Sequence, residues 1–246
     1  MGEANHANRI KYPRRRVIRA ILRFLTNVAI RIFGKLQVEG VENVPKSGPI
    51  ILAPNHFNFV DPPLILATSP RHTEFIGGAR NPGAPAWASI FPKLWGVIPA
   101  IRGAYARSTL RSSLQVLDQG GAIGIFPEGG NWAEVLRPAR PGVAYLAAHS
   151  ETPVIPVSII GAEDLLGWPR TVVKVIYHPP LPAPVIEEKG LAKREAIDAF
   201  GDQVMAVIAS ALPEEQQGKF SSCPKARAAA EAVSAFPFEQ DHMRGM

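Results

Sequence analysis

Apolar and polar positions along the chain follow two alternating patterns, one typical of strands and the other typical of helices. Short apolar runs that are rich in β-branched residues predict strands, and longer stretches with apolar residues at helical spacing predict helices. Because the two kinds of segment alternate, we expect an α/β fold with a mixed, largely parallel sheet flanked by helices. The expected strands are 36–41, 49–53, 73–77, 95–101, 121–126, 152–160 and 171–178, and the expected helices are 62–68, 85–94, 104–119, 139–149 and 187–212.

The segment from residue 13 to residue 35 has helical periodicity, but polar residues also recur at every fourth position. Each step of four residues drifts by about 40° around an α-helix, so this polar stripe would wind around one straight helix. We therefore expect a bend or break near Thr26 and Asn27 that gives two short helices. Charged residues interrupt the segment too often for a membrane-spanning helix or a cleavable signal peptide. The recurring polar residues are Lys11, Arg15, Arg19, Arg23, Asn27, Arg31 and Lys35.

The chain of 246 residues has a net charge of +6, and its excess of basic residues lies near the N-terminus. Residues 1–37 contain nine Lys or Arg against Glu3 alone, a net charge of +8, so the remainder is close to neutral. We expect a basic amphipathic segment that lies in the interface of an anionic membrane. An ordinary surface helix packed on the domain is the alternative. We do not expect nucleic-acid binding, because no recognisable module or aromatic platform accompanies the basic residues.

The composition indicates one α/β domain with an appended segment at each end. Hydrophobic residues make up 46% of the chain, which is enough for a substantial core. We expect membrane-docking helices at 1–35, a central domain at 36–212, and a C-terminal helix and tail at 213–246. The only cysteine, Cys223, excludes an internal disulfide framework and a Cys-rich metal site, which fits a reducing compartment.

A histidine and an aspartate lie at the junction between the strand expected at 49–53 and the helix expected at 62–68. Asp61 directly before Pro62 is typical of a helix start with Asp at the N-cap, so His56 lies in the connecting loop. Residues five apart point away from each other on one helix. Across a strand-to-helix turn, however, the carboxylate can reach the imidazole and fix its tautomer for general-base chemistry. On spacing alone, a loop histidine and a capping aspartate are the simpler interpretation.

Three further stretches lie at or near the ends of expected strands. Arg102 follows the apolar segment that begins at Gly96. A guanidinium just beyond the carboxyl end of a strand is well placed to bind a phosphate. An arginine in a solvated loop is an equally good interpretation. Glu128 follows another buried strand, and Gly129 next to it allows a close approach of the backbone. The stretch 153–158 is an apolar strand with two prolines, which on its own indicates only a sheet edge.

These stretches, taken together and in this order, resemble the glycerolipid acyltransferase family, the lysophosphatidic acid acyltransferases and their relatives. The resemblance covers roughly residues 35–180, and the basic N-terminal segment also resembles the membrane-docking segment of the family. Four blocks in one order make the match specific. The N-H-x-x-x-x-D block runs from Asn55 to Asp61, the G-x-x-x-x-x-R block from Gly96 to Arg102, the F-P-E-G block from Phe126 to Gly129, and the V-I-P-V block from Val154 to Val157.

The resemblance implies a glycerolipid-acyltransferase-like fold and transfer of an acyl group from acyl-CoA or acyl-carrier protein to a hydroxyl of a lysophospholipid. The first choice of acceptor is 1-acylglycerol-3-phosphate, and the implied location is the cytoplasmic face of the cell membrane, where the protein is peripheral or monotopic. His56 is implied as the general base and Asp61 as the carboxylate that orients it. The implied substrate-binding residues are Arg102, Glu128, Gly129 and Asn55.

The rest of the sequence favours direct transfer without a metal, a cofactor or a covalent intermediate. His56 and Asp61 have no convincing third ligand for a metal. No G-x-S-x-G motif is present, and Cys223 is far from the four blocks in sequence. Backbone N–H groups near the helix that starts at Pro62, or at Gly129-Gly130, are the expected donors to the oxyanion.

The chain departs from the family at the end of the third block, where the family commonly has E-G-T-R. Asn131 stands in place of the arginine, which the family usually uses for the acceptor phosphate. Arg102, Arg107 or Arg137 could replace it, or the acceptor could be a lysolipid without that phosphate, such as an aminolipid or glycolipid. Two further alternatives are a thioesterase in which His56 activates water and a catalytically silent membrane-binding protein.

Overall fold

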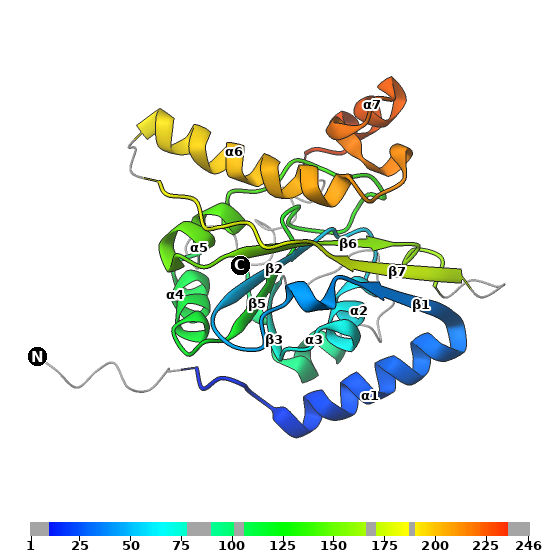
Figure 1. Ribbon diagram of the computed structural model, residues 1–246, viewed down its shortest axis with the longest axis vertical. Coiled ribbons are helices and arrows are strands. Elements are labelled where there is room, and N and C mark those ends of the chain that lie inside the picture. Colours follow the sequence, from blue (N-terminus) through cyan, green and yellow to red (C-terminus); the bar gives the residue numbers. More distant parts are fainter. Residues whose placement is uncertain (1–9, 78–89, 101–105, 166–170, 187–189, 236–246) are drawn as a thin grey trace, which may run out of the picture.

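The computed structural model describes residues 10–77, 90–100, 106–165, 171–186 and 190–235 (Figure 1). Within these residues, seven strands form one sheet in the order β1-β7-β6-β2-β5-β3-β4. Neighbouring strands are parallel except for β6 and β7, which are antiparallel. The strands are β1 (Gly34–Glu39), β2 (Ile50–Pro54), β3 (Thr73–Gly77), β4 (Ile98–Pro99), β5 (Ala122–Ile125), β6 (Val154–Ile160) and β7 (Thr171–Tyr177).

Helices cover both faces of the sheet (Figure 1). Helices α4, α5 and α6 lie on one face, and α1, α2 and α3 lie on the other. The helices are α1 (Arg16–Phe33), α2 (Asp61–Thr68), α3 (Ile90–Trp95), α4 (Ala106–Leu117), α5 (Gly142–Ser150), α6 (Gly190–Ala209) and α7 (Pro224–Ala232), with short 3-10 turns η1 (Val41–Asn43), η3 (Glu214–Gln216) and η4 (Gly218–Phe220).

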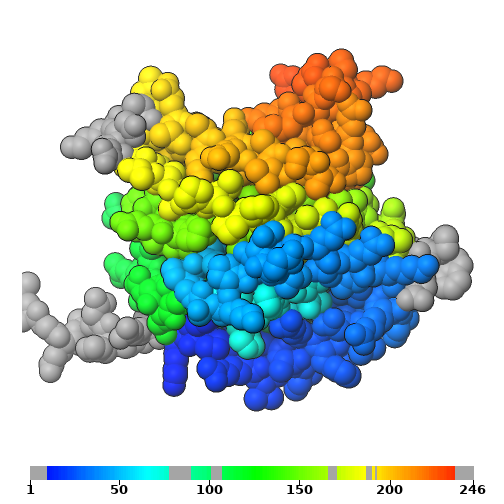
Figure 2. Space-filling view, in the orientation of Figure 1, coloured from blue at the N-terminus to red at the C-terminus, as the bar shows by residue number. Residues whose placement is uncertain are grey.

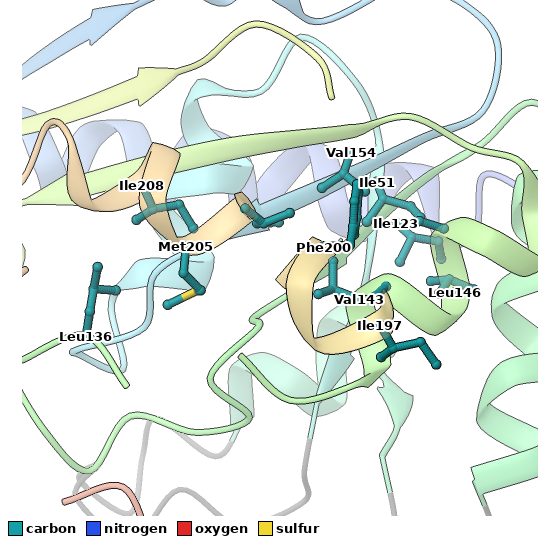
Figure 3. Close-up of a cluster of buried hydrophobic side chains, with 14 of the residues drawn as sticks. Ile51, Ile123, Leu136, Val143, Leu146, Val154, Ile197, Phe200, Met205 and Ile208 are labelled. Carbon is teal, nitrogen blue, oxygen red and sulfur yellow. The ribbon is translucent and has the colours of Figure 1, made fainter. Parts of the chain in front are cut away.

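Each face of the sheet has its own hydrophobic core, because side chains alternate along a strand. Ile51 and Ala53 of β2 belong to the core under α4, α5 and α6, whereas Ile50 and Leu52 belong to the core over α1 and α2. The first of these cores contains side chains from the sheet, from α5 and from α6 (Figure 3). Strand β2 is therefore buried on both sides, which fixes the position of the loop that follows it.

The expected α/β fold with a mixed, largely parallel sheet is confirmed. The strand predicted at 73–77 has the same limits in the structure, and other predicted segments differ by a few residues at their ends. The prediction of two short N-terminal helices is wrong, because α1 is one continuous helix from Arg16 to Phe33. The helix predicted at 85–94 lies partly outside the described residues, which show α3 from residue 90 onward.

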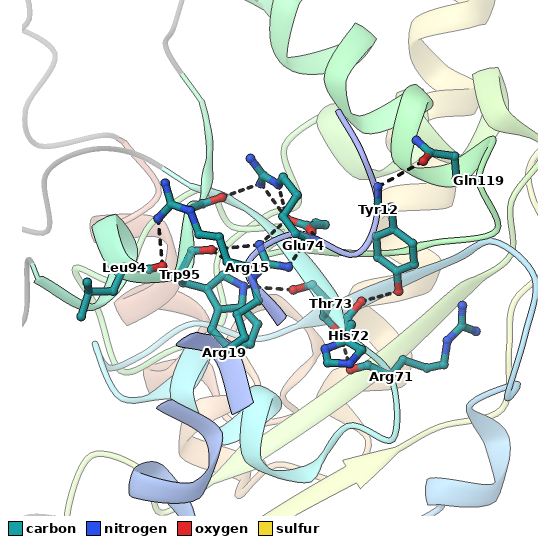
Figure 4. Close-up of polar contacts among 12 residues, drawn as sticks. Tyr12, Arg15, Arg19, Arg71, His72, Thr73, Glu74, Leu94, Trp95 and Gln119 are labelled. Atoms are coloured by element: carbon teal, nitrogen blue, oxygen red, sulfur yellow. Dashed lines mark hydrogen bonds and ion pairs between the residues drawn. The ribbon is translucent and has the colours of Figure 1, made fainter. Parts of the chain in front are cut away.

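The polar positions of α1 do not all have to face solvent, because Arg19 of this stripe is buried. The guanidinium of Arg19 is 1% exposed and donates to both carboxylate oxygens of Glu74 on β3, at 2.5 and 2.6 Å (Figure 4). Arg14 donates to the same carboxylate at 2.6 Å. Burial by itself would raise the pKa of Glu74, but the hydrogen bonds and charges of Arg19 and Arg14 lower that pKa below its usual value.

Arg14 and Arg19, together with Arg15, also bind the C-terminal end of α3. The last carbonyl groups of a helix have no partner within the helix and need donors from elsewhere. Arg15 donates to the carbonyl oxygens of Lys93 and Leu94 at 2.5 and 2.9 Å. Arg19 donates to the carbonyl oxygen of Trp95 at 2.9 and 3.1 Å. Arg14 donates to the carbonyl oxygen of Gly96 at 2.5 Å.

The outer face of α1 is largely apolar, and Arg16 and Arg31 are the exposed arginines of the helix. Val17, Phe24 and Ile32 are 74%, 67% and 60% exposed, and the helix lies at the surface along the lower edge of the molecule in Figure 2. None of the helices in the described part of the chain has both the length and the apolar character needed to cross a bilayer. The other exposed apolar residues of α1 are Ile18, Ile21, Leu25, Val28 and Phe33.

We predict that Glu74→Gln lowers the free energy of unfolding by about 3–5 kcal/mol near pH 7, because it leaves buried arginines without their anionic partner. The folded-state pKa of Glu74 is depressed, so its contribution is present above the unfolded value of 4.5 and is lost as the pH falls through the folded value. Urea unfolding at several pH values should therefore show the two proteins converging in acid.

The matched control is Glu39→Gln, which removes a surface ion pair with Lys174 at 2.8 Å. Because both partners are partly exposed, the expected loss is at most about 1 kcal/mol. Equal losses in the two variants would contradict a special role for the Glu74 carboxylate.

Candidate active site

The loop between β2 and α2 brings His56 and Asp61 together. Asp61 Oδ2 lies 3.0 Å from His56 Nδ1 and also accepts the backbone N–H groups of Phe57 and Asn58, at 2.8 and 2.7 Å. Asp61 is not the N-cap of α2, because it is the first residue of the helix and Val60 holds the cap position. Its carboxylate turns back toward the loop, which offers three donors to a single oxygen.

The Asp61 contact gives the imidazole of His56 a defined orientation. The carboxylate oxygen accepts the proton on Nδ1, so the lone pair of the neutral ring lies on Nε2. The ring also stacks on Phe126, which follows β5, with the ring centroids 4.0 Å apart. The side chain of His56 is 11% exposed, so it is mostly shielded from bulk water. An imidazole held in this way presents Nε2 as a possible site of proton transfer.

Glu128 lies under the same loop and connects it to the loop after β5. Its Oε1 accepts the backbone N–H of His56 at 2.7 Å, and its Oε2 accepts the backbone N–H of Arg137 at 3.2 Å. The Nε atom of Arg137 lies 3.3 Å from the same Oε2. Burial raises the pKa of Glu128 to about 7, although the positive charge of Arg137 opposes this effect. The carboxylate thus holds the position of His56.

Asn55 and Glu128, which the resemblance implies as substrate-binding residues, are both buried and hydrogen-bonded within the protein. Asn55 is 1% exposed, and its Nδ2 donates to the carbonyl oxygen of Ile159 at 3.0 Å while its Oδ1 accepts the Ile159 N–H at 2.7 Å. Glu128 is also 1% exposed. The nitrogen and the oxygen of the Asn55 side-chain amide and both oxygens of Glu128 are thus engaged with the protein, so these residues are in positions to hold loops.

The remaining predicted residues lie around this centre or outside the described part of the chain. Gly129 is exposed and has a φ of 75°, a conformation in which glycine has no steric cost. Arg102 lies outside the described residues. Arg107 is exposed on the first turn of α4, and Arg137 is buried beside Glu128. Of the two candidate replacements for position 131 that the structure describes, Arg137 is the one that contacts Glu128.

The start of α2 cannot supply the oxyanion donors that were expected there. Pro62 and the proline after it have no N–H, and the N–H groups of Asp61 and Leu64 donate to the carbonyls of residues 58 and 60. The Gly129 N–H donates to the Phe126 carbonyl at 3.1 Å. That expectation is therefore wrong for α2, and the turn at Gly130 is the remaining candidate.

One contact at the site was not predicted from the sequence, the stacking of Phe126 on His56. A signal for it was present, because Phe126 ends the strand next to β2 and parallel strands end at the same edge of the sheet. Among the described residues, no group of three or more His, Cys, Asp or Glu side chains is arranged to hold a metal ion.

Comparison with known proteins finds relatives whose names state one and the same activity. The chain is 27% identical over 183 residues to the chloroplastic 1-acyl-sn-glycerol-3-phosphate acyltransferase BAT2 of Brassica napus, with 68% of this chain and 51% of that protein covered. It is also 27% identical over 183 residues to the chloroplastic 1-acyl-sn-glycerol-3-phosphate acyltransferase LPAT1 of Arabidopsis thaliana, covering 68% and 49%. The chain thus spans about half the length of these relatives.

Comparison of folds gives a similar result. The structure superimposes on the crystal structure of the 1-acyl-sn-glycerophosphate (LPA) acyltransferase PlsC from Thermotoga maritima with a TM-score of 0.53 and 22% sequence identity. The superposition covers 80% of this chain and 84% of that one. A model of the Acyltransferase family matches residues 35–160. Because this match spans half of the chain, the protein belongs to the acyltransferase family and is a distant relative of the enzymes named above.

Proposed function

We propose that the protein transfers a fatty acyl group from acyl-CoA or acyl-carrier protein to a hydroxyl of a lysophospholipid, with 1-acylglycerol-3-phosphate as the first choice of acceptor. The observation that carries this proposal is the contact of 3.0 Å between His56 Nδ1 and Asp61 Oδ2 at the carboxyl end of β2. A neutral imidazole with Nε2 available is the group that an acceptor hydroxyl needs for deprotonation.

The proposed reaction is a direct transfer. His56 Nε2 accepts the proton of the acceptor hydroxyl while the hydroxyl oxygen attacks the thioester carbonyl carbon. The tetrahedral intermediate then collapses, the carbon–sulfur bond breaks, and the leaving thiolate takes the proton from Nε2. Asp61 stabilises the imidazolium that exists between these two steps. The N–H of Gly130 is the proposed donor to the oxyanion.

The identity of the acceptor is a separate part of the proposal. Asn131 is half-buried and uncharged, and Arg137 is 2% exposed and bound to Glu128. Neither side chain offers an exposed cation beside His56, so recognition of a phosphate would depend on Arg102 or Arg107. A lysolipid without that phosphate, such as an aminolipid or a glycolipid, is therefore the second candidate acceptor. Hydrolysis of the thioester by water is the third candidate reaction.

We further propose that α1 docks the enzyme on a lipid surface at the cytoplasmic face of the cell membrane. The geometry of α1 supports insertion of its apolar face, since Arg19 is buried against Glu74, and Arg14 and Arg15 just before the helix bind groups of the protein body. Arg23 also turns toward the body, where its Nη2 lies 3.5 Å from the carbonyl oxygen of Ala67. The docking therefore relies on hydrophobic burial more than on attraction to anionic lipids, in contrast to the basic surface expected from charge alone.

We predict that His56→Ala lowers kcat by about 10²–10⁴-fold, because the variant lacks the general base. The assay is transfer of a labelled acyl group from acyl-CoA to 1-acylglycerol-3-phosphate, a lyso-aminolipid and a lyso-glycolipid, with thiol release measured in the absence of acceptor. The matched control is His149→Ala, which removes an exposed histidine of α5 and should leave the rate unchanged.

The outcomes of this assay separate the candidate functions. Turnover of His56→Ala close to that of wild type would refute the mechanism. Thiol release by wild type that does not depend on acceptor would favour a thioesterase, and transfer only to an uncharged acceptor would favour the second candidate. Circular dichroism of both variants should match wild type, because neither side chain is needed for the core.

We predict that replacing Val17, Ile21 and Phe24 together by Ser weakens vesicle binding by at least about tenfold, because each buried apolar side chain contributes roughly 1.5–3 kcal/mol. Sedimentation with neutral and anionic vesicles at low and high salt measures the effect. The matched control is Arg16→Gln, an exposed basic residue of the same helix. Apolar docking would be contradicted if the triple variant bound vesicles as well as wild type, while binding was largely lost in Arg16→Gln or by the wild-type protein at high salt.

A further inference from the structure

The loop between Gly130 and Arg137 is held by the C-terminal segment of the described chain, residues 214–234. Trp132 Nε1 donates to the carbonyl oxygen of Val233, directly after α7, at 3.0 Å. The backbone N–H of Leu136 donates to the carbonyl oxygen of Gln216 in η3 at 2.9 Å. The C-terminal segment therefore contacts this loop at two separate points.

Close packing at Gly218 reinforces the second contact. Gly218 has a φ of 60°, and a Cβ atom at this position would lie 2.1 Å from the carbonyl oxygen of Leu136. Only a residue without a side chain allows η4 to approach the loop this closely. The approach of the C-terminal segment to the loop is thus a specific feature of the sequence.

Inside the loop, Trp132 covers the guanidinium of Arg137. The Cζ atom of Arg137 lies 3.6 Å from the centre of the Trp132 ring, within the range of a cation–π contact. Arg137 is 2% exposed and also donates to the carbonyl oxygen of Gly130. Its guanidinium is therefore held from one side by the indole ring and from another by the Glu128 carboxylate.

The contacts continue from Arg137 to the candidate base. Glu128 Oε2 faces the backbone N–H and Nε of Arg137, and Glu128 Oε1 accepts the backbone N–H of His56. Hydrogen bonds to an ionised acceptor are roughly twice as strong as those to a neutral one, so the charge state of Glu128 affects how firmly His56 is held. Successive contacts thus run from Val233 through Trp132, Arg137 and Glu128 to His56.

We propose that Trp132 and Arg137 are positioning residues for His56, and that residues 214–234 complete the active site by holding them. The proposal rests on the proposed role of His56 as the general base. The charge of Arg137 opposes protonation of the buried Glu128 and helps to orient its carboxyl group, and the indole ring of Trp132 shields the pair from water. The C-terminal segment, which has no residue in the four sequence blocks, acts on the reaction through this loop.

The charged groups around Glu128 determine the expected pH dependence. They are Arg137 from its own loop and His56 and Asp61 from the segment after β2, and Arg140 in turn faces Arg137. The charge of Arg137 lowers the pKa of Glu128 and that of Asp61 raises it. Removal of the Arg137 charge therefore makes Glu128 take up a proton at a higher pH.

The test compares Arg137→Gln and Trp132→Leu with the milder variants Arg137→Lys and Trp132→Phe. In the first two we expect kcat to fall by about tenfold to a hundredfold, with the KM of donor and acceptor within twofold of wild type, because the base is displaced while substrate binding is not. The acid limb of the kcat profile should move to higher pH in Arg137→Gln and stay in place in Arg137→Lys.

The milder variants and a matched control keep the test decisive if a drastic variant fails to fold. Trp132→Phe retains the ring over Arg137 and loses only the bond to Val233, so its kcat should fall by less than that of Trp132→Leu. Lys225→Gln removes an exposed cation of α7, in the same C-terminal segment. Its kcat and pH profile should match wild type.

A second measurement does not depend on catalysis. NMR spectra of ¹⁵N-labelled histidine report the ring nitrogens of His56, and its signals should shift or broaden in Trp132→Leu and Arg137→Gln but not in Lys225→Gln. If no acceptor is used by wild type, the proposed function fails and this measurement still tests the positioning. Unchanged His56 signals and an unchanged kcat in Trp132→Leu and Arg137→Gln would overturn the proposal. An effect of Arg137→Gln that is confined to a higher KM of the acceptor would also overturn it, because that result would assign Arg137 to substrate binding.

Discussion

The buried carboxylate of Glu128 is the interaction on which the geometry of the candidate site depends. A carboxylate removed from water is costly unless hydrogen bonds and an opposite charge compensate it, and Glu128 receives two backbone N–H groups and the guanidinium of Arg137. These partners come from the loops after β2 and β5, which are neighbours in the sheet. Satisfying this one charge therefore fixes the two loops that surround His56 relative to each other.

A second buried carboxylate, Glu74, has the corresponding role for α1. Two arginines share its charge, and the same guanidinium groups cap the carbonyls at the end of α3. Because this arrangement draws the arginines inward, the apolar side chains of α1 are left on the outer surface. The orientation of α1 thus follows from an internal ion pair, and the proposed docking surface is a consequence of that orientation.

The parallel order of the central strands explains why residues distant in sequence meet at one place. The carboxyl ends of β2 and β5 lie at the same edge of the sheet, so His56 and Asp61 from one loop meet Phe126 and Glu128 from the next. The PlsC structure from Thermotoga maritima has a similar fold. The chemistry proposed for the chain then depends on groups in loops, while the strands supply their positions.

Local pattern alone determined the strands and most helices, because strand periodicity and helix starts are encoded by neighbours in sequence. The spacing of five residues left the contact between His56 and Asp61 as one of two interpretations, and the order of the four sequence blocks favoured it. The tertiary structure decided which side of α1 is covered and that Asn55 and Glu128 hold loops. Their partners lie 104 and 72 residues away, beyond the reach of any local pattern. Helical periodicity shows that a helix has two faces. Which face is buried depends on a partner such as Glu74, whose burial only the folded chain establishes.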